Sequence, residues 1–279
     1  MVKRFIRILR SASLLPVILL SSCLDLDDSL FNPQKLSSYT LSTSVIPESQ
    51  RVFVTLKSEG YHIYGYFVRS RNIDNDVTIV YFHGNKHHLQ YYWDRVELLY
   101  RMGFNVFVFD YRGFGMSEGE PSEEGLYADG LAALNYVLQR PEVLTSGVVF
   151  YGFSLGNAVS FELAARFFDP MAVVAEAPFA SAKTLVQSGT LVDIPSSYVM
   201  KGEYNNAEKA KLIRSPLLLL HGTEDKFIDI EKNSQVIFAN ANEPKRFVRI
   251  PGADHSEIPA KMGEQAYIDL IQTFINGTR

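Results

Sequence analysis

Residues 148–158 read Val148-Val149-Phe150-Tyr151-Gly152-Phe153-Ser154-Leu155-Gly156-Asn157-Ala158. The apolar run predicts a buried strand, the G-x-S-x-G pattern a tight turn, and the small residues after it the start of a helix. Such a turn lifts Ser154 Oγ above the end of the strand and aims the backbone N–H of Leu155 at the same space. Gly152 and Gly156 suit the turn because a Cβ at either position would strike the neighbouring helix or strand. A capping serine gives the same pattern, so a catalytic interpretation needs partner residues elsewhere in the chain.

The segments 220–225 and 251–255 supply the two partners that a nucleophilic serine needs. A serine hydroxyl is a poor nucleophile at neutral pH and requires a base, which an acid must orient. The first segment ends at Asp225 and the second at His255, each just after a predicted strand. We expect His255 to take the proton of Ser154, and Asp225 to hold the imidazole tautomer.

Other carboxylates compete with Asp225 for the role of the acid. Glu176 follows another predicted strand, and Glu224 directly precedes Asp225. Asp254 is too close in sequence to His255 to orient its ring easily. Asp225 could also be an ordinary loop aspartate, and His255 is one of six histidines.

A turn after the third predicted strand, Tyr81-Phe82-His83-Gly84-Asn85, predicts the second donor of an oxyanion hole. Acyl transfer develops a negative oxygen that two converging N–H groups stabilise. We assign these donors to the backbone of Asn85 and Leu155, although glycine and asparagine also favour plain turns. His83, His87 and His88 do not indicate a metal site, because Gly84 and Asn85 interrupt any helix that would align two of these histidines on one face.

Eight strand-like runs alternate with five helix-like segments after residue 50. Short, continuous apolar runs predict parallel strands buried on both faces, and the alternation predicts a doubly wound α/β sheet in one domain. The predicted strands are 51–57, 61–69, 77–82, 105–110, 147–151, 172–176, 216–221 and 246–250, the first two forming a hairpin. The predicted helices are 88–102, 123–139, 155–168, 230–239 and 261–275. Residues 180–215 are predicted to form a small lid over the acyl pocket, with a surface crossover as the alternative.

These segments together resemble the α/β-hydrolase-fold serine hydrolases over residues 50–276. The chain is similar to the group of Bem46-like proteins, ABHD17-type depalmitoylases and serine-aminopeptidase-like esterases. The matching segments are the turn 83–85, the D-Y-R-G-x-G-x-S-x-G run at 110–119, the elbow 152–156, Glu176-Ala177-Pro178-Phe179 and the segment 221–225. The resemblance implies a mostly parallel eight-stranded sheet flanked by helices, and a triad in the order Ser154, Asp225, His255. It also implies that 110–119 is a structural loop and that Glu176 is not the acid. The sequence Lys86-His87-His88 differs from that of many relatives and leaves the substrate preference open.

The first 23 residues predict export rather than folding. Four basic residues lie within the first ten, and the apolar stretch 14–20 is shorter than the roughly 20 residues that span a bilayer. Leu20-Ser21-Ser22-Cys23 resembles the lipobox of bacterial lipoproteins, in which the cysteine is acylated after the leader is removed. We therefore expect a signal peptide over 1–22, a lipidated Cys23, a tether over 23–46 and a hydrolase domain over 47–279. An ordinary signal peptide with a coincidental cysteine and a buried N-terminal helix are the alternatives.

The composition restricts the function further. The 279 residues are 47% apolar with a formal net charge of −4, and no basic block follows the first ten residues, so nucleic acid is not an expected partner. The single cysteine excludes an intramolecular disulfide. The prediction is a serine hydrolase of carboxylic esters or thioesters, without cofactor or metal, anchored by Cys23 to the bacterial cell envelope and acting on a small acyl substrate. An amidase or peptidase on the same triad and a non-catalytic envelope lipoprotein are the alternatives, and the acyl chain, leaving group and oligomeric state stay open.

Overall fold

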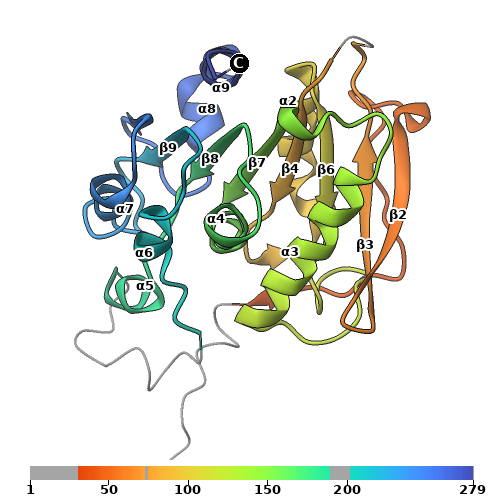
Figure 1. Ribbon diagram of the computed structural model, residues 1–279, viewed down its shortest axis with the longest axis horizontal. Helices are drawn as coiled ribbons and strands as arrows, with labels where there is room; N and C mark the ends of the chain where they lie inside the picture. The colour runs from red at the N-terminus through yellow and green to blue at the C-terminus, as the bar shows by residue number, and fades with distance from the viewer. Residues whose placement is uncertain (1–30, 73–74, 189–201, 279) are drawn as a thin grey trace, which may run out of the picture.

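Eight strands form one sheet in the order β10-β9-β8-β7-β4-β6-β3-β2 in the computed structural model, which describes residues 31–72, 75–188 and 202–278 (Figure 1). Neighbours from β10 to β6 run parallel, whereas β3 is antiparallel to both β6 and β2. The strands are Arg51–Ser58 (β2), Tyr61–Val68 (β3), Thr78–Phe82 (β4), Asn105–Phe109 (β6), Val148–Phe153 (β7), Ala172–Glu176 (β8), Leu217–Gly222 (β9) and Lys245–Ile250 (β10). The predicted α/β fold with a mostly parallel sheet is confirmed.

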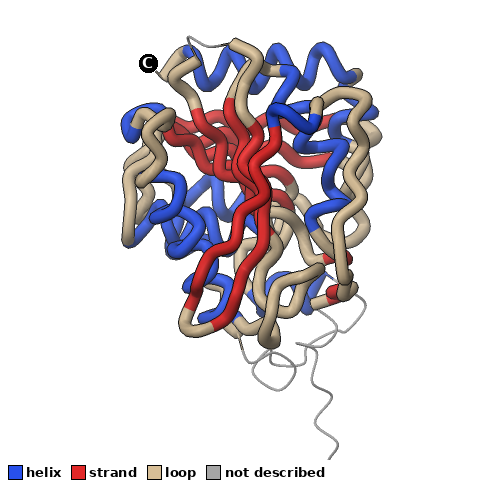
Figure 2. Tube along the Cα trace, turned by 90° about the vertical axis from the view of Figure 1, so that its right-hand side faces the viewer, coloured by secondary structure: helices blue, strands red, loops and turns tan. Residues whose placement is uncertain are grey.

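Helices cover both faces of the sheet, as the edge view in Figure 2 shows. One buried cluster joins the sheet to α3 (Glu123–Leu138), α4 (Gly156–Arg166), α6 (Asn206–Ala210) and α7 (Ser234–Asn240). A second cluster joins the other face to α2 (Trp93–Arg101), α8 (Ile258–Met262) and α9 (Glu264–Asn276). Every residue of β4, β6, β7, β8 and β9 is buried, which explains their continuous apolar sequences.

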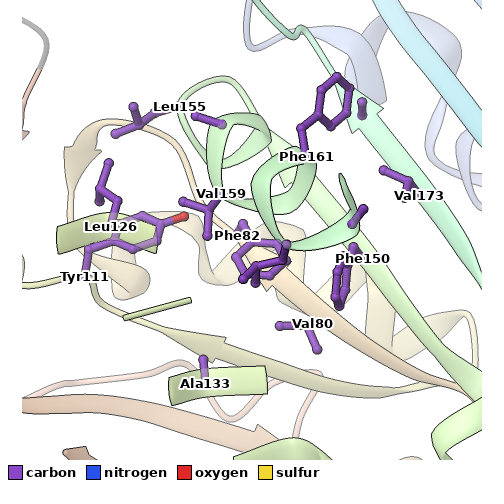
Figure 3. Close-up of a cluster of buried hydrophobic side chains, with 14 of the residues drawn as sticks. Val80, Phe82, Tyr111, Leu126, Ala133, Phe150, Leu155, Val159, Phe161 and Val173 are labelled. Atoms are coloured by element: carbon purple, nitrogen blue, oxygen red, sulfur yellow. The ribbon is translucent and has the colours of Figure 1, made fainter. Parts of the chain in front are cut away.

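The core beneath the start of α4 is aromatic (Figure 3). The ring of Phe82 meets those of Phe109 and Phe150 edge to face, at centroid distances of 6.0 and 5.6 Å. Leu155 and Val159 of the α4 region belong to the same buried cluster. The ends of β4 and β7 therefore rest on a close-packed base, which fixes the turn between β7 and α4.

The helices differ from the predicted segments at their ends. The predicted helix 88–102 begins as a 3-10 turn, Leu89–Tyr92 (η2), before α2, and the predicted helix 261–275 is divided into α8 and α9 at Gly263, whose φ is +81°. Two further 3-10 turns cover Glu48–Gln50 (η1) and Thr145–Gly147 (η3). No helix within the described ranges is long and apolar enough to cross a bilayer.

The N-terminal segment from residue 31 packs on the domain, ahead of the predicted start of the hydrolase domain at residue 47. Phe31 and Ile46 are buried in the two core clusters. Asn32–Pro33 (β1) pairs in parallel with Lys86–His87 (β5) as a separate two-stranded sheet. Hydrogen bonds of the backbone hold this segment, and its polar, aperiodic sequence does not report them. The signal peptide, Cys23 and the rest of the predicted tether lie outside the described residues.

The predicted lid over 180–215 is described only at its two ends. Ala182–Ser188 (α5) and α6 contribute Ala182, Val186 and Ala210 to the buried core. These ends are therefore part of the packed domain. Residues 189–201, on which the lid prediction depends, lie outside the described part of the chain.

Candidate active site

Ser154 occupies a strained turn between β7 and α4. Its φ is +51°, in the left-handed region that a residue with a Cβ adopts only when its surroundings enforce it. The Ser154 N–H donates to the Glu176 carbonyl at 3.0 Å. The Asn157 amide donates to the Ser154 and Glu176 carbonyls at 3.1 and 2.9 Å. These bonds tie the turn to the end of β8.

Glycines allow the close approach that this turn requires. A Cβ on Gly156 would lie 1.9 Å from the Phe82 carbonyl oxygen, and one on Gly152 would lie 2.6 Å from Asn157 Oδ1. Neither contact is tolerable, so the steric reason for both glycines is confirmed. The start of α4 consequently touches the end of β4, where the turn 83–85 begins.

The structure brings Ser154, His255 and Asp225 together. His255 Nε2 lies 2.9 Å from Ser154 Oγ, and His255 Nδ1 lies 2.7 Å from Asp225 Oδ2. Asp225 follows β9 and His255 follows β10, so the three groups come from the carboxyl ends of three parallel strands. Because a carboxylate only accepts, Nδ1 carries a proton and Nε2 is left to accept the serine hydroxyl proton.

The carboxylate of Asp225 is held in its charged form. Its Oδ1 accepts the backbone N–H groups of Phe227 and Ile228 at 2.9 and 2.8 Å, and Oδ2 lies 3.1 Å from His221 Nε2. Burial alone would raise the pKa of Asp225, but the hydrogen bonds from His221 and His255 hold it well below its ordinary value of 3.8. His221 was not assigned a role from the sequence, although it lies in the segment that ends at Asp225. The signal in the sequence is a histidine at the end of a predicted apolar strand, four residues before the acid.

Glu176 has a different set of partners and does not contact His255. Its buried carboxylate binds Arg95 Nη1 and the hydroxyls of Tyr151 and Tyr267, both at 2.7 Å. Burial would lower the pKa of the Arg95 guanidinium, but Glu176 raises it well above its ordinary value. Glu176 therefore balances a buried cation.

Arg95 links this ion pair to the triad. Its Nη2 donates to the carbonyl of Ser256, next to His255, at 3.1 Å, and its guanidinium lies 4.0 Å from the ring centroid of Phe153. The pair Arg95–Glu176 thus braces both the histidine loop and the serine turn.

The other two candidate acids are also set apart from the histidine ring. Asp254 Oδ1 accepts the backbone N–H groups of His255 and Lys226 at 2.8 and 3.2 Å. Glu224 is exposed. Among the described carboxylates, the ring of His255 is paired with Asp225.

The turn His83-Gly84-Asn85 lies beside the serine turn, because β4 pairs with β7 and Phe82 is in register with Gly152. A Cβ on Gly84 would lie 2.7 Å from Tyr92 Oη and 3.0 Å from the ring of Phe153. His83 is fully buried, and its Nδ1 donates to the Gly84 carbonyl at 2.7 Å. The described His, Cys, Asp and Glu residues include no cluster of three or more suited to a metal ion.

A cavity of about 850 Å³ lies beside the triad, which contributes His255 to its lining. Its lining includes Asn85 and Lys86 from the turn after β4, and Phe153, Phe227 and His255. Its remaining lining residues are Asn32, Tyr91, Tyr92, Asp94, Arg95, Leu98, Lys226, Asp254, Ser256, Pro259 and Ala260. Its size suits a small organic substrate, for which pockets of roughly 300–1,000 Å³ are usual.

Known proteins are similar to this chain in sequence. The serine aminopeptidase S33 family matches residues 74–195. YfhR of Escherichia coli K12 is 32% identical over 256 residues, covering 89% of this chain and 84% of YfhR. Human α/β-hydrolase domain-containing protein 17B is 31% identical over 225 residues, covering 80% of this chain and 74% of the human protein. This chain belongs to the α/β-hydrolase family. Within this family it falls in the Bem46-like group.

The solved structure of the Pyrococcus furiosus esterase Pf2001 has the same fold. It superposes with a TM-score of 0.72 at 19% identity, covering 89% of this chain and 97% of the esterase.

In this α/β-hydrolase, buried side chains hold the loop 110–119 in place. Arg112 pairs with Asp129 at 2.8 Å, and Ser117 Oγ donates to the Asp110 carbonyl at 2.7 Å. These contacts agree with a structural loop.

Proposed function

We propose that this hydrolase cleaves carboxylic esters or thioesters through an acyl intermediate on Ser154. The observation that supports the proposal is the continuous hydrogen-bonded chain from Ser154 through His255 to Asp225, beside a cavity that His255 lines. A strained turn that presents a serine to an oriented imidazole is the arrangement that nucleophilic acyl transfer needs.

The proposed reaction uses side chains and backbone groups of the chain itself. His255 accepts the proton as Ser154 Oγ attacks the acyl carbon, and Asp225 stabilises the imidazolium that forms. The backbone N–H groups of Asn85 and Leu155 are the proposed donors to the developing oxyanion. His255 then returns the proton to the leaving alcohol or thiol, and water releases the acyl group by the same steps.

The cavity favours an ester or thioester over an aminopeptidase substrate. An aminopeptidase must hold the α-ammonium group of its substrate, which calls for an available carboxylate. Two carboxylates line the cavity, and Oδ1 of each binds its own loop: Asp94 accepts the Arg95 N–H at 2.8 Å, and Asp254 accepts those of Lys226 and His255. The mouth instead exposes Tyr91 and Phe227, which offer apolar surface to an acyl chain or its leaving group.

Two series of chromogenic substrates test this choice. The first compares p-nitrophenyl esters of increasing acyl length, and the second compares aminoacyl p-nitroanilides whose α-amino group is free or acetylated. We expect turnover of the esters, and at most weak anilide cleavage that changes less than about threefold on acetylation, because the proposed site binds its substrate through the acyl group and not through an amine. Efficient cleavage of the free aminoacyl anilides that acetylation abolishes would identify a peptidase instead.

We further propose that the chain is anchored to a bacterial envelope membrane through lipidated Cys23. Support comes from the basic and apolar leader and the Leu20-Ser21-Ser22-Cys23 sequence. Asn32, which lines the cavity, lies nine residues after Cys23 (32 − 23 = 9), and nine residues span at most about 32 Å. The anchor would therefore keep the cavity within that distance of the membrane surface.

Metabolic labelling tests the anchor. Cells that express the full chain are supplied with an alkyne fatty acid, and the protein is expected to carry the label and to fractionate with membranes. Cys23→Ala should lose both properties, because Cys23 is the only cysteine in the chain. Cys23→Ala protein that keeps the label, or wild-type protein that never acquires it, would contradict the proposal.

A further inference from the structure

We infer that residues 31–39, here called the N-terminal strap, position the turn 83–87 that carries one proposed oxyanion donor. The inference rests on the proposed function. It assigns a catalytic consequence to a segment that the sequence predicts to be a tether. The residues of the strap are positioning residues, since they act through the turn and through Asp110.

The first contact is a pair of backbone hydrogen bonds along β1 and β5. The Asn32 N–H donates to the Asn85 carbonyl at 3.0 Å, and the Gln34 N–H donates to the His87 carbonyl at 2.9 Å. Phe31 fixes the start of the strap by burying its ring in the core. The strap therefore holds the residue whose own N–H is the proposed donor.

The outer part of the turn has an unfavourable backbone conformation. Lys86 is exposed, and His87 has a φ of +55°, which is costly for a residue with a Cβ. From the inner side, the Lys86 N–H donates to Tyr92 Oη at 3.1 Å. A surface turn in an unfavourable backbone conformation depends on such bonds to keep a single geometry.

The strap is itself fixed to the structural loop 110–119. The Gly115 N–H donates to the Gln34 carbonyl and the Leu36 N–H donates to the Gly115 carbonyl, both at 3.0 Å. The Lys35 ammonium donates to the Ser117 carbonyl at 2.7 Å. The strap thus bridges two loops at the carboxyl ends of β4 and β6.

The second contact runs from the half-buried Tyr39 to the buried side chains of Asp110 and His83. The Tyr39 hydroxyl donates to Asp110 Oδ2 at 2.5 Å, and Asp110 Oδ1 accepts the Leu89 N–H and lies 3.1 Å from His83 Nε2. Because His83 Nδ1 donates to the Gly84 carbonyl, this line of contacts ends within the turn 83–87. Burial, reinforced by Asp110, raises the pKa of Tyr39 well above its ordinary value, which keeps its hydroxyl a donor.

The geometry of an oxyanion donor controls transition-state binding more than substrate binding. Loss of one donor costs about 10²–10³-fold in kcat, and displacing it costs part of that amount. Loosening the turn should therefore lower kcat while KM changes little. It should also weaken binding of a boronic acid, whose tetrahedral adduct with Ser154 imitates the transition state.

Two variants and one matched control test the inference in the full-length protein, with a p-nitrophenyl ester as substrate. Gln34→Pro removes the N–H that binds His87 but suits an extended backbone, whereas Gln34→Ala keeps it. Tyr39→Phe removes one hydroxyl and keeps the ring that packs against Tyr66. Gln34→Pro and Tyr39→Phe are each expected to lower kcat about tenfold while KM stays within twofold of wild type. Each should also raise the Ki of a boronic acid about tenfold. Gln34→Ala should match wild type in all three constants.

Thermal unfolding of each variant accompanies the kinetics, and Tyr39→Phe decides the result if Gln34→Pro unfolds. The inference is wrong if Tyr39→Phe has wild-type kcat and boronic acid affinity, or if Gln34→Ala loses as much activity as Gln34→Pro. If either result is found in a protein that a fluorophosphonate still labels, only the inference about the strap is refuted. Failure of the folded wild type to react with the fluorophosphonate refutes the proposed function itself.

Discussion

Replacing Ser154 with alanine is expected to lower kcat by at least about 10⁴-fold and to abolish labelling by a fluorophosphonate. The hydroxyl is the only group at this position that His255 can deprotonate, and its bond to His255 Nε2 is 2.9 Å. The backbone bonds from Ser154 to Glu176 and Asn157 do not involve the hydroxyl, so the fold should be unaffected. Steady-state kinetics with a p-nitrophenyl ester and gel fluorescence with the labelled probe measure the two effects.

The outcomes separate the three interpretations of the site. Labelling or turnover that persists in Ser154→Ala would place the nucleophile elsewhere. A well-folded wild-type protein that neither reacts with the probe nor turns over any ester would instead support a non-catalytic envelope lipoprotein. Peptidase activity that Ser154→Ala eliminates would preserve the triad and change only the substrate class.

Asp225→Asn is expected to lower kcat by about 10³–10⁴-fold. An asparagine can accept the N–H groups of Phe227 and Ile228 as Asp225 does, so the loop keeps its hydrogen bonds. It carries no charge, so it cannot stabilise the imidazolium, and its amide can turn an N–H toward Nδ1 and favour the wrong tautomer. Kinetics at saturating ester, with the thermal midpoint as a check on folding, measure the effect.

Glu176→Gln is the matched control for the choice of acid. It leaves Arg95 buried beside a neutral partner, and removing one member of a buried pair costs about 3–5 kcal/mol of unfolding free energy. The folded variant should nevertheless retain kcat within about tenfold of wild type, because Glu176 does not bind the histidine ring. Full turnover in Asp225→Asn together with its loss in folded Glu176→Gln would overturn the assignment.

Local sequence patterns predict the sheet and the serine turn well, for physical reasons. Strands buried on both faces must be apolar throughout, as in Val148–Phe153 and Leu217–Gly222, and such runs are easily recognised. Positions 152 and 156 require glycine, because a Cβ there would lie only 2.6 and 1.9 Å from its nearest neighbour. The convergence of Ser154, Asp225 and His255 follows from the rule that parallel strands end at one edge of a sheet.

Features that depend on contacts distant in sequence were not predictable in this way. Asn32–Pro33 of the strap pairs with Lys86–His87 through main-chain groups. Every residue type has these groups, so the amino-acid sequence does not indicate the pairing. His221 and Arg95 act on the triad through buried partners that only the folded chain brings close. The short α5 and α6 are held by packing against the core, and helices of this length carry too little periodicity to be recognised.

The most direct test is to trap the acyl group during turnover. Wild-type protein is mixed with an excess of a slowly deacylating p-nitrophenyl ester and quenched in acid within milliseconds to seconds, and its peptides are then mapped by mass spectrometry. We expect a burst of nitrophenol approaching one per active site and the acyl mass on the peptide that contains Ser154. Rapid turnover without any acylated peptide, or acylation of a different side chain, would contradict it.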